Sequence, residues 1–432
     1  MGSYQATINV AIIGGGPAGL AAAISLSKLP FLSTVLYERN SEPQEVGAGI
    51  SLSYNAWKVL DLLGAADGVK GFSKADTRQR NGYTGKVILL QPHPENGDLD
   101  PRGAIRTRRT RLQSGLLEKV PDGVIKYGKK LVSAQNAGTE GVRLSFEDGT
   151  EALADLVIGA DGIRSREQVI RKTLYPDHTI HFTGNTVWRT LVPRSSLSHI
   201  PDVTNGTSWW YVKGGHAYLS GVDDSSEIPL EKQLFELSVR SYHEPDIPGR
   251  TVSWGIPATN ERVQARFVRY DQRVRDAIAA VPEGAWKEFA NYAGPGPEKI
   301  TGWNKVVLIG DASHPLHGAF GSGATFGMED GWLLAQALEH EYSLGSETLV
   351  EDTLQTFEEI RLPYYKRMYR YLDAQRASAK KAEEEEKTFE ELLELRFKSL
   401  GIGQKDNLNW IYKHDIGKVW SDYLKGIKEF HG

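Results

Sequence analysis

Three glycines near the N-terminus have the spacing of a phosphate-binding turn. Gly14, Gly16 and Gly19 follow an apolar run at residues 8–13, which predicts a buried strand, and lead into residues 18–29, which predict a helix. The first glycine permits a tight turn, the second lets a pyrophosphate approach the backbone, and the third lets helix and strand pack closely. The N–H groups at the helix start would face the phosphates. The pattern predicts a dinucleotide site.

An acidic residue supports this interpretation. Residues 34–37 predict the next strand, and Glu38 follows it directly. A carboxylate at this place accepts hydrogen bonds from an adenosine ribose. A glycine-rich turn that binds nothing is the alternative, but strand, turn, helix, strand and acid in this order favour the dinucleotide.

Two further predicted strands end in aspartates. Residues 155–160 are followed by Asp161, and residues 305–309 are followed by Asp311, a glycine-containing loop and a predicted helix. Ligands of doubly wound sheets bind at the carboxyl ends of the strands. Both aspartates are therefore candidate ligand contacts.

Four arginines precede a predicted apolar helix. A solvated basic face is one interpretation, and a guanidinium group on a cofactor phosphate is the other. The spacing to Leu112 favours Arg109 for the second role. The cluster consists of Arg106, Arg108, Arg109 and Arg111.

The composition changes between about residues 170 and 300. Strand-like runs rich in Trp, Tyr, Thr and Val predict a largely antiparallel sheet, inserted as a second domain. Most of its aromatic side chains are expected in the core or on a sheet face, although such a face also suits a flat substrate. The runs are residues 179–192, 207–213, 216–222 and 251–256. Residues 76–108 are too polar for a core, with a hairpin expected near residues 82–90.

The amino-acid composition excludes several classes of function. The 432 residues carry a net charge of −4 and include no cysteine. Disulfides, thiolate catalysis and cysteine-ligated metals are thus excluded, and we expect no metal site. The charge gives no reason to expect nucleic acid as a partner. No run is apolar enough to span a membrane and no signal peptide is visible, so a cytoplasmic location is expected.

Three separated pieces together resemble the single-component flavoprotein aromatic hydroxylases, which include salicylate and 4-hydroxybenzoate hydroxylases. They are the Gly14–Gly19 turn with Glu38, residues 155–165 (DLVIGADGIRS) and residues 307–330 (VLIGDASHPLHGAFGSGATFGMED). The Arg109-x-x-Leu112 spacing fits the same family. One departure is Gly318, where the family commonly has proline. With Pro315 and His317, this loop resembles a fungal-type variant that includes decarboxylating enzymes.

The resemblance implies that the dinucleotide is FAD. NADH or NADPH would visit briefly as electron donor, and O2 would be the co-substrate. The family places Glu38 on the adenosine ribose and Arg109 near the pyrophosphate. Gly49 and Ser51 would lie along the flavin, Asp311 on the ribityl chain and Ala324 facing the isoalloxazine, while Asp161 would serve both FAD and the nicotinamide donor.

The resemblance also implies a fold and its domains. We expect an α/β chain with a discontinuous Rossmann-like FAD-binding domain, an inserted, mainly antiparallel substrate sheet and a helical C-terminal tail. The FAD-binding domain would comprise residues 5–75, 105–170 and 300–345. Residues 76–104 and 171–299 would form the substrate domain, and residues 346–432 the helical region, in a monomer or homodimer.

The implied reaction is hydroxylation of a small phenolic aromatic of the hydroxybenzoate or salicylate type. Reduced FAD and O2 would form a flavin hydroperoxide that a phenolate attacks. Carbon dioxide would leave where the attacked carbon carries a carboxylate. Candidate catalytic residues are Arg189 and Tyr218, and candidate substrate contacts are Trp210 and His317. A monooxygenase acting on a larger secondary metabolite and a non-catalytic flavin-binding protein are the alternatives.

Overall fold

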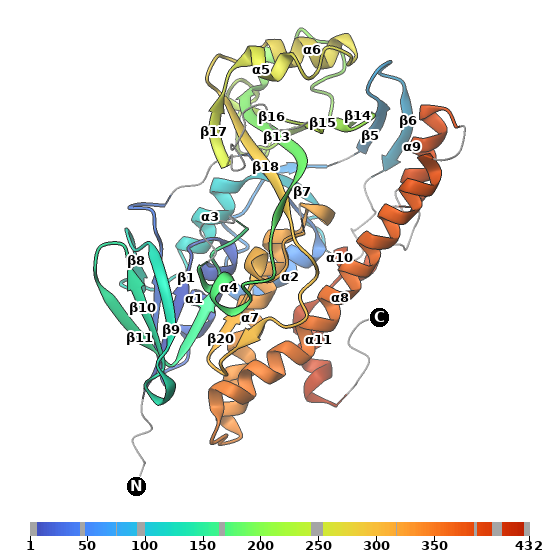
Figure 1. Cartoon of the computed structure of the whole chain (residues 1–432). Coiled ribbons are helices and arrows are strands. Elements are labelled where there is room, and N and C mark those ends of the chain that lie inside the picture. Colours follow the sequence, from blue (N-terminus) through green and yellow to red (C-terminus); the bar gives the residue numbers. More distant parts are fainter. Residues whose placement is uncertain are drawn as a thin grey trace.

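Two large sheets dominate the computed structural model (Figure 1). A six-stranded sheet lies in the lower half of the view, an eight-stranded sheet lies above it, and a long helix runs along one side of both. The structure describes residues 7–43, 48–74, 76–92, 100–163, 169–242, 254–316, 318–383, 387–399 and 408–426.

The six-stranded sheet has the order β19-β20-β12-β1-β2-β8. Its neighbouring strands are parallel except for β19, which pairs antiparallel with β20. The chain contributes strands to this sheet from three widely separated segments, as expected for a discontinuous Rossmann-like fold. The strands are β1 (Ile8–Ile13), β2 (Leu32–Tyr37), β8 (Ile125–Lys126), β12 (Leu156–Gly159), β19 (Thr301–Gly302) and β20 (Val306–Leu308).

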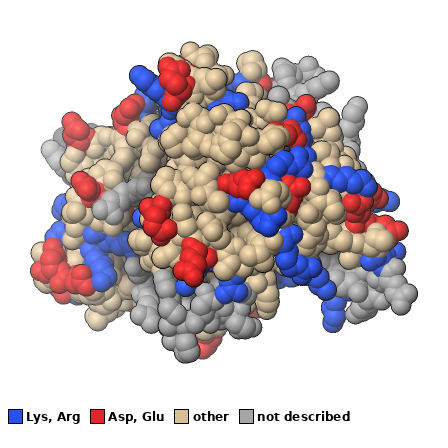
Figure 2. Space-filling model, turned by 90° about the horizontal axis from the view of Figure 1, so that it is seen from above, with Lys and Arg blue, Asp and Glu red and all other residues tan. Residues whose placement is uncertain are grey.

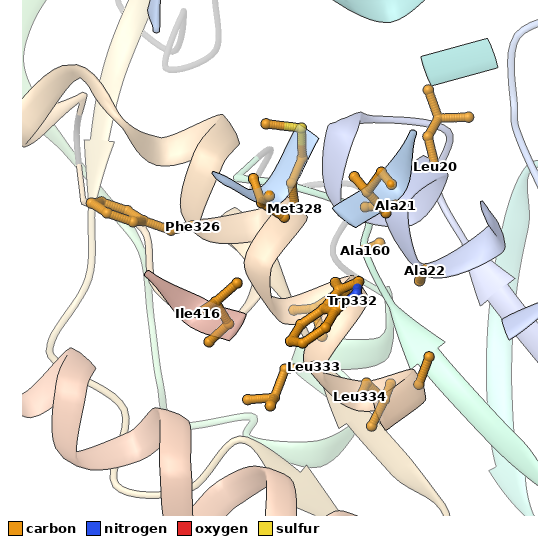
Figure 3. Packing of buried hydrophobic residues seen from close by; sticks show 14 of the residues in the cluster. Leu20, Ala21, Ala22, Ala160, Phe326, Met328, Trp332, Leu333, Leu334 and Ile416 are labelled. Atoms are coloured by element: carbon orange, nitrogen blue, oxygen red, sulfur yellow. The ribbon is translucent and has the colours of Figure 1, made fainter. Parts of the chain in front are cut away.

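The core beside this sheet depends on close contact between α1 (Pro17–Leu26) and α7 (Gly323–Ser343). A Cβ at Gly331 would lie 2.8 Å from the Ala18 carbonyl oxygen, and one at Gly327 would lie 2.8 Å from the Ala18 Cβ. The two helices therefore touch through small residues. Figure 3 shows side chains of both helices in one apolar cluster, among them Ala22 and Trp332.

The eight-stranded sheet has the order β17-β18-β13-β16-β15-β14-β5-β6 and is antiparallel except between β14 and β5. The helices α5 (Asn260–Gln264) and α6 (Gln272–Ala279) cover one face, over a core that contains Trp188 and Trp286. Its strands are β5 (Asp76–Asn81), β6 (Val87–Pro92), β13 (His181–Pro193), β14 (Thr207–Val212), β15 (Gly215–Gly221), β16 (Leu234–Tyr242), β17 (Trp254–Ala258) and β18 (Trp286–Ala293).

Two small sheets and seven further helices complete the described part of the chain. One three-stranded sheet has the order β3-β7-β4 and another has the order β11-β10-β9. The remaining strands are β3 (Gly49–Leu52), β4 (Phe72–Ser73), β7 (Ile105–Arg108), β9 (Leu131–Asn136), β10 (Val142–Phe146) and β11 (Glu151–Ala154). The remaining helices are α2 (Tyr54–Leu63), α3 (Arg109–Leu117), α4 (Val169–Leu174), α8 (Leu349–Glu383), α9 (Phe389–Ser399), α10 (Asn409–Tyr412) and α11 (Ile416–Leu424).

The expected fold class is confirmed, with corrections in detail. The hairpin is present as β5 and β6, but the expectation that residues 76–108 contain no core was wrong. Arg80 is 3% exposed and Gln79 is 2% exposed, because β5 is an inner strand of the sheet. The strands β16 and β18 were not expected, and residues 251–253 lie outside the described residues. Of the helices in the described ranges, none has the length and apolar character needed to cross a membrane.

Replacing Gly331 by alanine should destabilise the chain. The added Cβ would press on the α1 backbone at Ala18 and Ala22. Overpacking of this kind costs about 1–3 kcal/mol, more than the gain in helix propensity. Gly68→Ala is the control, because its Cβ would have no neighbour closer than 3.6 Å. Urea unfolding measures both variants, and equal stability of the two would contradict the packing argument.

Candidate active site

The glycine turn after β1 has the predicted geometry. Gly14 has a φ of 111°, and a Cβ there would collide with the Ala160 carbonyl. A Cβ at Gly19 would collide with the Gly14 carbonyl, so the strand-to-helix turn needs both glycines. A Cβ at Gly16 would meet nothing within 4 Å. Gly16 is thus the open side of the turn, at the start of α1, where a pyrophosphate can approach the backbone.

Glu38 lies beside this turn, as the sequence predicted. Its Oε2 accepts a hydrogen bond from the Gly15 N–H at 2.7 Å, and its Oε1 accepts one from the Asn40 N–H at 2.9 Å. These two bonds fix the orientation of the carboxylate. The turn and the acid that follows β2 are therefore brought together, as a dinucleotide site requires.

Asp161 follows β12, next to the glycine turn. Both of its carboxylate oxygens are buried without a hydrogen-bond partner among the residues that the structure describes. Burial raises the pKa of Asp161 to about 7, and nearby backbone N–H groups of α4 and the charge of Arg171 oppose this shift only partly. Residues 164–168 lie outside the described ranges. An unpartnered buried carboxylate fits a role in holding a hydroxyl or amide donor of a ligand.

Asp311 lies where β20 leads toward α7. A Cβ built at Gly323, the first residue of α7, would lie 3.5 Å from Asp311 Oδ1. Burial raises the pKa of Asp311, while the charges of His314 and Arg109 lower it. Ala324 follows Gly323 directly. Asp311, Arg109 and the start of α7 are thus close enough to serve one ligand.

One buried carboxylate, Asp330 of α7, fixes the turn that carries Asp311. Its Oδ2 accepts hydrogen bonds from the Gly310 N–H at 2.8 Å and from His314 Nε2 at 3.2 Å. Its Oδ1 accepts from Arg361 Nε at 2.7 Å and from the Tyr365 hydroxyl, both on α8. Burial raises the pKa of Asp330, but Arg361 and His314 outweigh burial and hold this pKa below its usual value.

The C-terminal segment extends this network. Arg361 also lies 3.2 Å from Glu329 Oε2, and Glu329 Oε1 lies 2.9 Å from His414 Nδ1. The Tyr412 hydroxyl donates to the carbonyl oxygen of Phe320 at 3.0 Å. Phe320 stands in the loop before α7 with a φ of 65°, a conformation that bulky residues rarely adopt. The C-terminal segment therefore stabilises the loop at the start of α7.

The sheet register aligns the predicted catalytic residues. Arg189 of β13 pairs with Ser238 of β16, Ser238 pairs with Tyr218 of β15, and Tyr218 pairs with Trp209 of β14. Directly paired residues point to the same face of a sheet. These four side chains therefore form a row on the face opposite α5 and α6, which we call the aromatic face.

One predicted substrate contact, Trp210, is not brought to this row. Trp210 points to the other face, where it is fully buried in the core and its indole N–H donates to Ser208 Oγ at 2.8 Å. The neighbouring Trp209 occupies the aromatic face instead, since strand residues alternate in direction. His317 lies outside the described residues, so the structure does not place it.

A partly buried cationic cluster lies beside the row, and sequence reasoning missed most of it. Arg106 binds Glu236 through Nε at 2.7 Å and a terminal nitrogen at 2.6 Å. Arg106 also donates to Ser51 Oγ at 3.0 Å, and Lys74 Nζ donates to the same oxygen at 2.7 Å. A Cβ at Gly49 would lie 2.5 Å from both Arg106 Nε and Glu236 Oε2. The only signal in the sequence was that Arg106 belongs to the arginine cluster.

The other arginines of the sequence cluster before α3 have different partners from Arg106. Arg108 binds Asp223 through two nitrogens, at 2.7 and 2.6 Å, and Arg111 lies 3.1 Å from Glu227. Arg109, the residue chosen from the spacing, is the first residue of α3 and lowers the pKa of both Asp311 and Arg189. Its charge thus acts on the cofactor side and on the aromatic face together.

Comparison with known proteins shows which class of protein this chain resembles. Residues 7–191 match the family model described as FAD binding domain. The chain is 30% identical over 336 residues to a 2-heptyl-3-hydroxy-4(1H)-quinolone synthase of Pseudomonas aeruginosa, covering 76% of this chain and 80% of that protein. It is 29% identical to a 3-amino-4-hydroxybenzoate 2-monooxygenase of Streptomyces platensis, covering 95% and 97%.

A solved structure agrees on the fold. The substrate complex of salicylate hydroxylase superposes with a TM-score of 0.74 at 23% identity, covering 96% of this chain and 97% of that one. The chain belongs to the FAD-dependent aromatic monooxygenases. The residues present fit the cofactor, since the open Gly16, the oriented Glu38 and the unpartnered Asp161 are grouped at the carboxyl ends of β1, β2 and β12.

Removing the charge of Asp330 should lower the free energy of unfolding much more than removing a surface charge. In Asp330→Asn, Arg361 stays buried without its main counter-charge, which costs about 3–5 kcal/mol of unfolding free energy. FAD content should fall as well, because asparagine has a single acceptor oxygen and cannot accept both from the Gly310 turn and from α8. The control is Asp373→Asn, which breaks an exposed ion pair of α8 at 3.0 Å. Comparable shifts in urea unfolding for the two variants would contradict the central role of Asp330.

The free energy of unfolding of the apoprotein should depend on pH in a way that reflects the raised pKa of Asp161. Its pKa is about 7 when folded and 3.8 when unperturbed, so between these values the folded chain binds more protons than the unfolded chain. The contribution of Asp161 therefore makes the free energy of unfolding fall as pH rises through this window. Asp161→Asn should lack that decrease. Urea titrations across the window test this, and an unchanged pH slope in the variant would refute the assignment.

Proposed function

We propose that the protein hydroxylates a small anionic phenol, of the hydroxybenzoate or salicylate type, with NADH or NADPH as electron donor and O2 as co-substrate. The observation that carries this proposal is an excess of partly buried positive charge at the aromatic face. The two guanidinium groups of Arg106 and Arg189 both interact there with the carboxylate of Glu236, and the Lys74 amine lies beside them with its pKa lowered by burial. Burying cations without counter-charge is costly. An anionic substrate would supply that counter-charge.

Arg189 and Tyr218 each have a polar atom that is available for a hydrogen bond to a ligand. Arg189 Nε and the Tyr218 hydroxyl are buried and have no hydrogen-bond partner among the described residues. Burial lowers the pKa of Arg189 to about 10, and the charge of Glu236 opposes this shift. The guanidinium group still remains charged near neutral pH, and its planar fork matches a carboxylate. We assign Arg189 to the substrate carboxylate and Tyr218 to a hydrogen bond with the substrate.

The cations of the aromatic face do not belong to a large charged patch on the face that Figure 2 shows. On that face, acidic and basic side chains are interspersed without a large area of either sign. The cations of the aromatic face are partly shielded from water, where each charge acts more strongly on a ligand. This supports recognition of a small molecule that enters the interior.

The protein and the cofactor have separate tasks. When bound, FAD supplies the activation of O2 at the expense of the nicotinamide donor. The residues of this chain bind the substrate, hold it against the cofactor and favour its phenolate, which makes the ring electron-rich. Where the hydroxylated carbon carries the carboxylate, we expect carbon dioxide to leave. The loop with Pro315 after His314 supports this outcome by its resemblance to decarboxylating relatives.

The relatives support two substrate classes. The Streptomyces relative is named for 3-amino-4-hydroxybenzoate, a carboxylated phenol, and matches nearly the whole chain. The Pseudomonas aeruginosa relative is named for an alkyl quinolone, which favours the alternative of a larger metabolite. The cations support the carboxylated phenol, because a neutral quinolone would add no counter-charge to that of Glu236, which Arg106 and Arg189 share.

A panel of phenols tests the proposal. Carboxylated phenols such as salicylate and 4-hydroxybenzoate should stimulate NADH or NADPH oxidation by the yellow holoenzyme, with product mass showing one added oxygen or its exchange for the carboxylate. Arg189→Met should raise KM for these substrates by about 30-fold or more, the cost of deleting one partner of a buried charge pair. Arg194→Met is the matched control, because Arg194 binds Gln233 and Thr204 away from the row.

Two results would contradict the proposal. Stimulation by uncharged aromatics alone would favour the larger metabolite. A protein that retains FAD but oxidises neither nicotinamide with any phenol would be a flavin-binding protein without hydroxylase activity.

A further inference from the structure

We propose that Lys74 takes the proton of the substrate phenol and then holds the phenolate as its ammonium partner. The inference rests on the proposed function and names the residue that would ionise the substrate. Lys74 follows β4 directly, and its Nζ donates to Ser51 Oγ at 2.7 Å. Its amine therefore lies inside the cationic cluster and not at the outer surface of the sheet.

The groups around Lys74 come from four strands. Ser51 stands on β3, Arg106 on β7, Tyr218 on β15 and Glu236 on β16. The guanidinium group of Arg106 lies over the Tyr218 ring, with its carbon 4.9 Å from the ring centre. Lys74 thus lies beside Tyr218, which shares its row with Arg189.

The hydrogen bonds of Ser51 indicate where a phenolic oxygen could bind. Its hydroxyl oxygen accepts from both Lys74 Nζ and Arg106, the second bond at 3.0 Å. A hydroxyl oxygen has two acceptor positions, so both are used and its own O–H must donate to a third group. The Tyr218 hydroxyl is buried, and it interacts with Lys74 as well. The hydroxyls of Ser51 and Tyr218 thus both lie next to the Lys74 amine, where they could donate to a phenolic oxygen bound there.

Lys74 is better suited to accept the proton than Arg106. Two bonds to Glu236 at 2.7 and 2.6 Å neutralise Arg106, and arginine does not give up its proton in proteins. Lys74 forms no ion pair with a carboxylate in the part of the chain that the structure describes. Burial lowers the pKa of Lys74 and Arg106 lowers it further, while Tyr218 and Glu236 oppose them. Burial therefore disfavours the charged form of Lys74 and makes its amine a better proton acceptor than an exposed lysine.

The proposed step balances without any further reactant. The phenolic O–H bond breaks and an N–H bond forms at Lys74 Nζ, so the pair becomes a phenolate and an ammonium ion. No oxidation state changes. The ammonium charge then lies beside the phenolate, and the hydroxyls of Ser51 and Tyr218 donate to the same oxygen.

The test measures the ionisation of a bound probe in the holoenzyme. The probe is 4-hydroxy-3-nitrobenzoate, whose phenol and phenolate forms differ in visible absorption. Wild-type protein should bind it as the phenolate at pH values where the free probe is still a phenol. In Lys74→Met, the apparent pKa of the bound probe should rise by about one unit or more, the usual effect of losing an adjacent opposite charge. Lys74→Arg should give an intermediate value, because the charge is kept.

Lys70→Met is the matched control. Lys70 lies four positions earlier, is exposed, and binds Glu227 at 2.7 Å, outside the cluster. Its replacement should leave the ionisation of the bound probe unchanged. Flavin absorbance in each variant reports whether FAD is retained, and if Lys74→Met loses FAD, the comparison of Lys74→Arg with wild type decides.

The outcomes separate this inference from the proposed function. An unchanged probe pKa in the Lys74 variants would overturn the role of Lys74, even if phenols are hydroxylated. A probe pKa that depends on Lys74 in a protein that no phenol stimulates would support the pocket and overturn the proposed reaction. Failure of the wild type to bind the probe would overturn the inference, because a phenolate pocket must accept this acidic phenol.

Discussion

The carboxylate of Asp330 is the interaction on which the cofactor side of the structure depends. It accepts hydrogen bonds from the turn after β20 and from α8, while its own backbone lies in α7. A buried carboxylate is tolerated only when donors surround it, so these segments must keep their relative positions. The turn then places Asp311 beside Gly323 at the start of α7. One interaction thereby aligns the strand end, the loop and the helix that meet the cofactor.

Two ion pairs likewise fix the position of β7 relative to the eight-stranded sheet. Arg106 binds Glu236, and Arg108 binds Asp223, so β7 is joined twice to the eight-stranded sheet. The Arg106 pair passes so close to Gly49 that no side chain could stand there. The resemblance predicts Gly49 along the flavin, and the structure shows a reason for glycine that does not depend on the flavin. The ion pairs hold the aromatic face above β3.

Local patterns could be predicted from the sequence, and long-range pairings could not. The glycine turn and Glu38 lie within one strand–helix–strand unit, so their spacing alone places them together. Arg106 and Glu236 meet only because β7 and β16 adjoin, and β16 was not expected. Similarly, either Trp209 or Trp210 must point to the aromatic face, since strand residues alternate. Only the pairing of Trp209 with Tyr218 decides which one does.

The two halves of the site present different groups, and Arg109 acts on both. Backbone N–H groups and carboxylates lie at the glycine turn, whereas cations prevail at the aromatic face. The charge of Arg109 lowers the pKa of both Asp311 and Arg189. Arg109 begins α3 directly after β7, the strand whose ion pairs reach Glu236 and Asp223. The same short segment of the chain therefore places positive charge for both halves of the site.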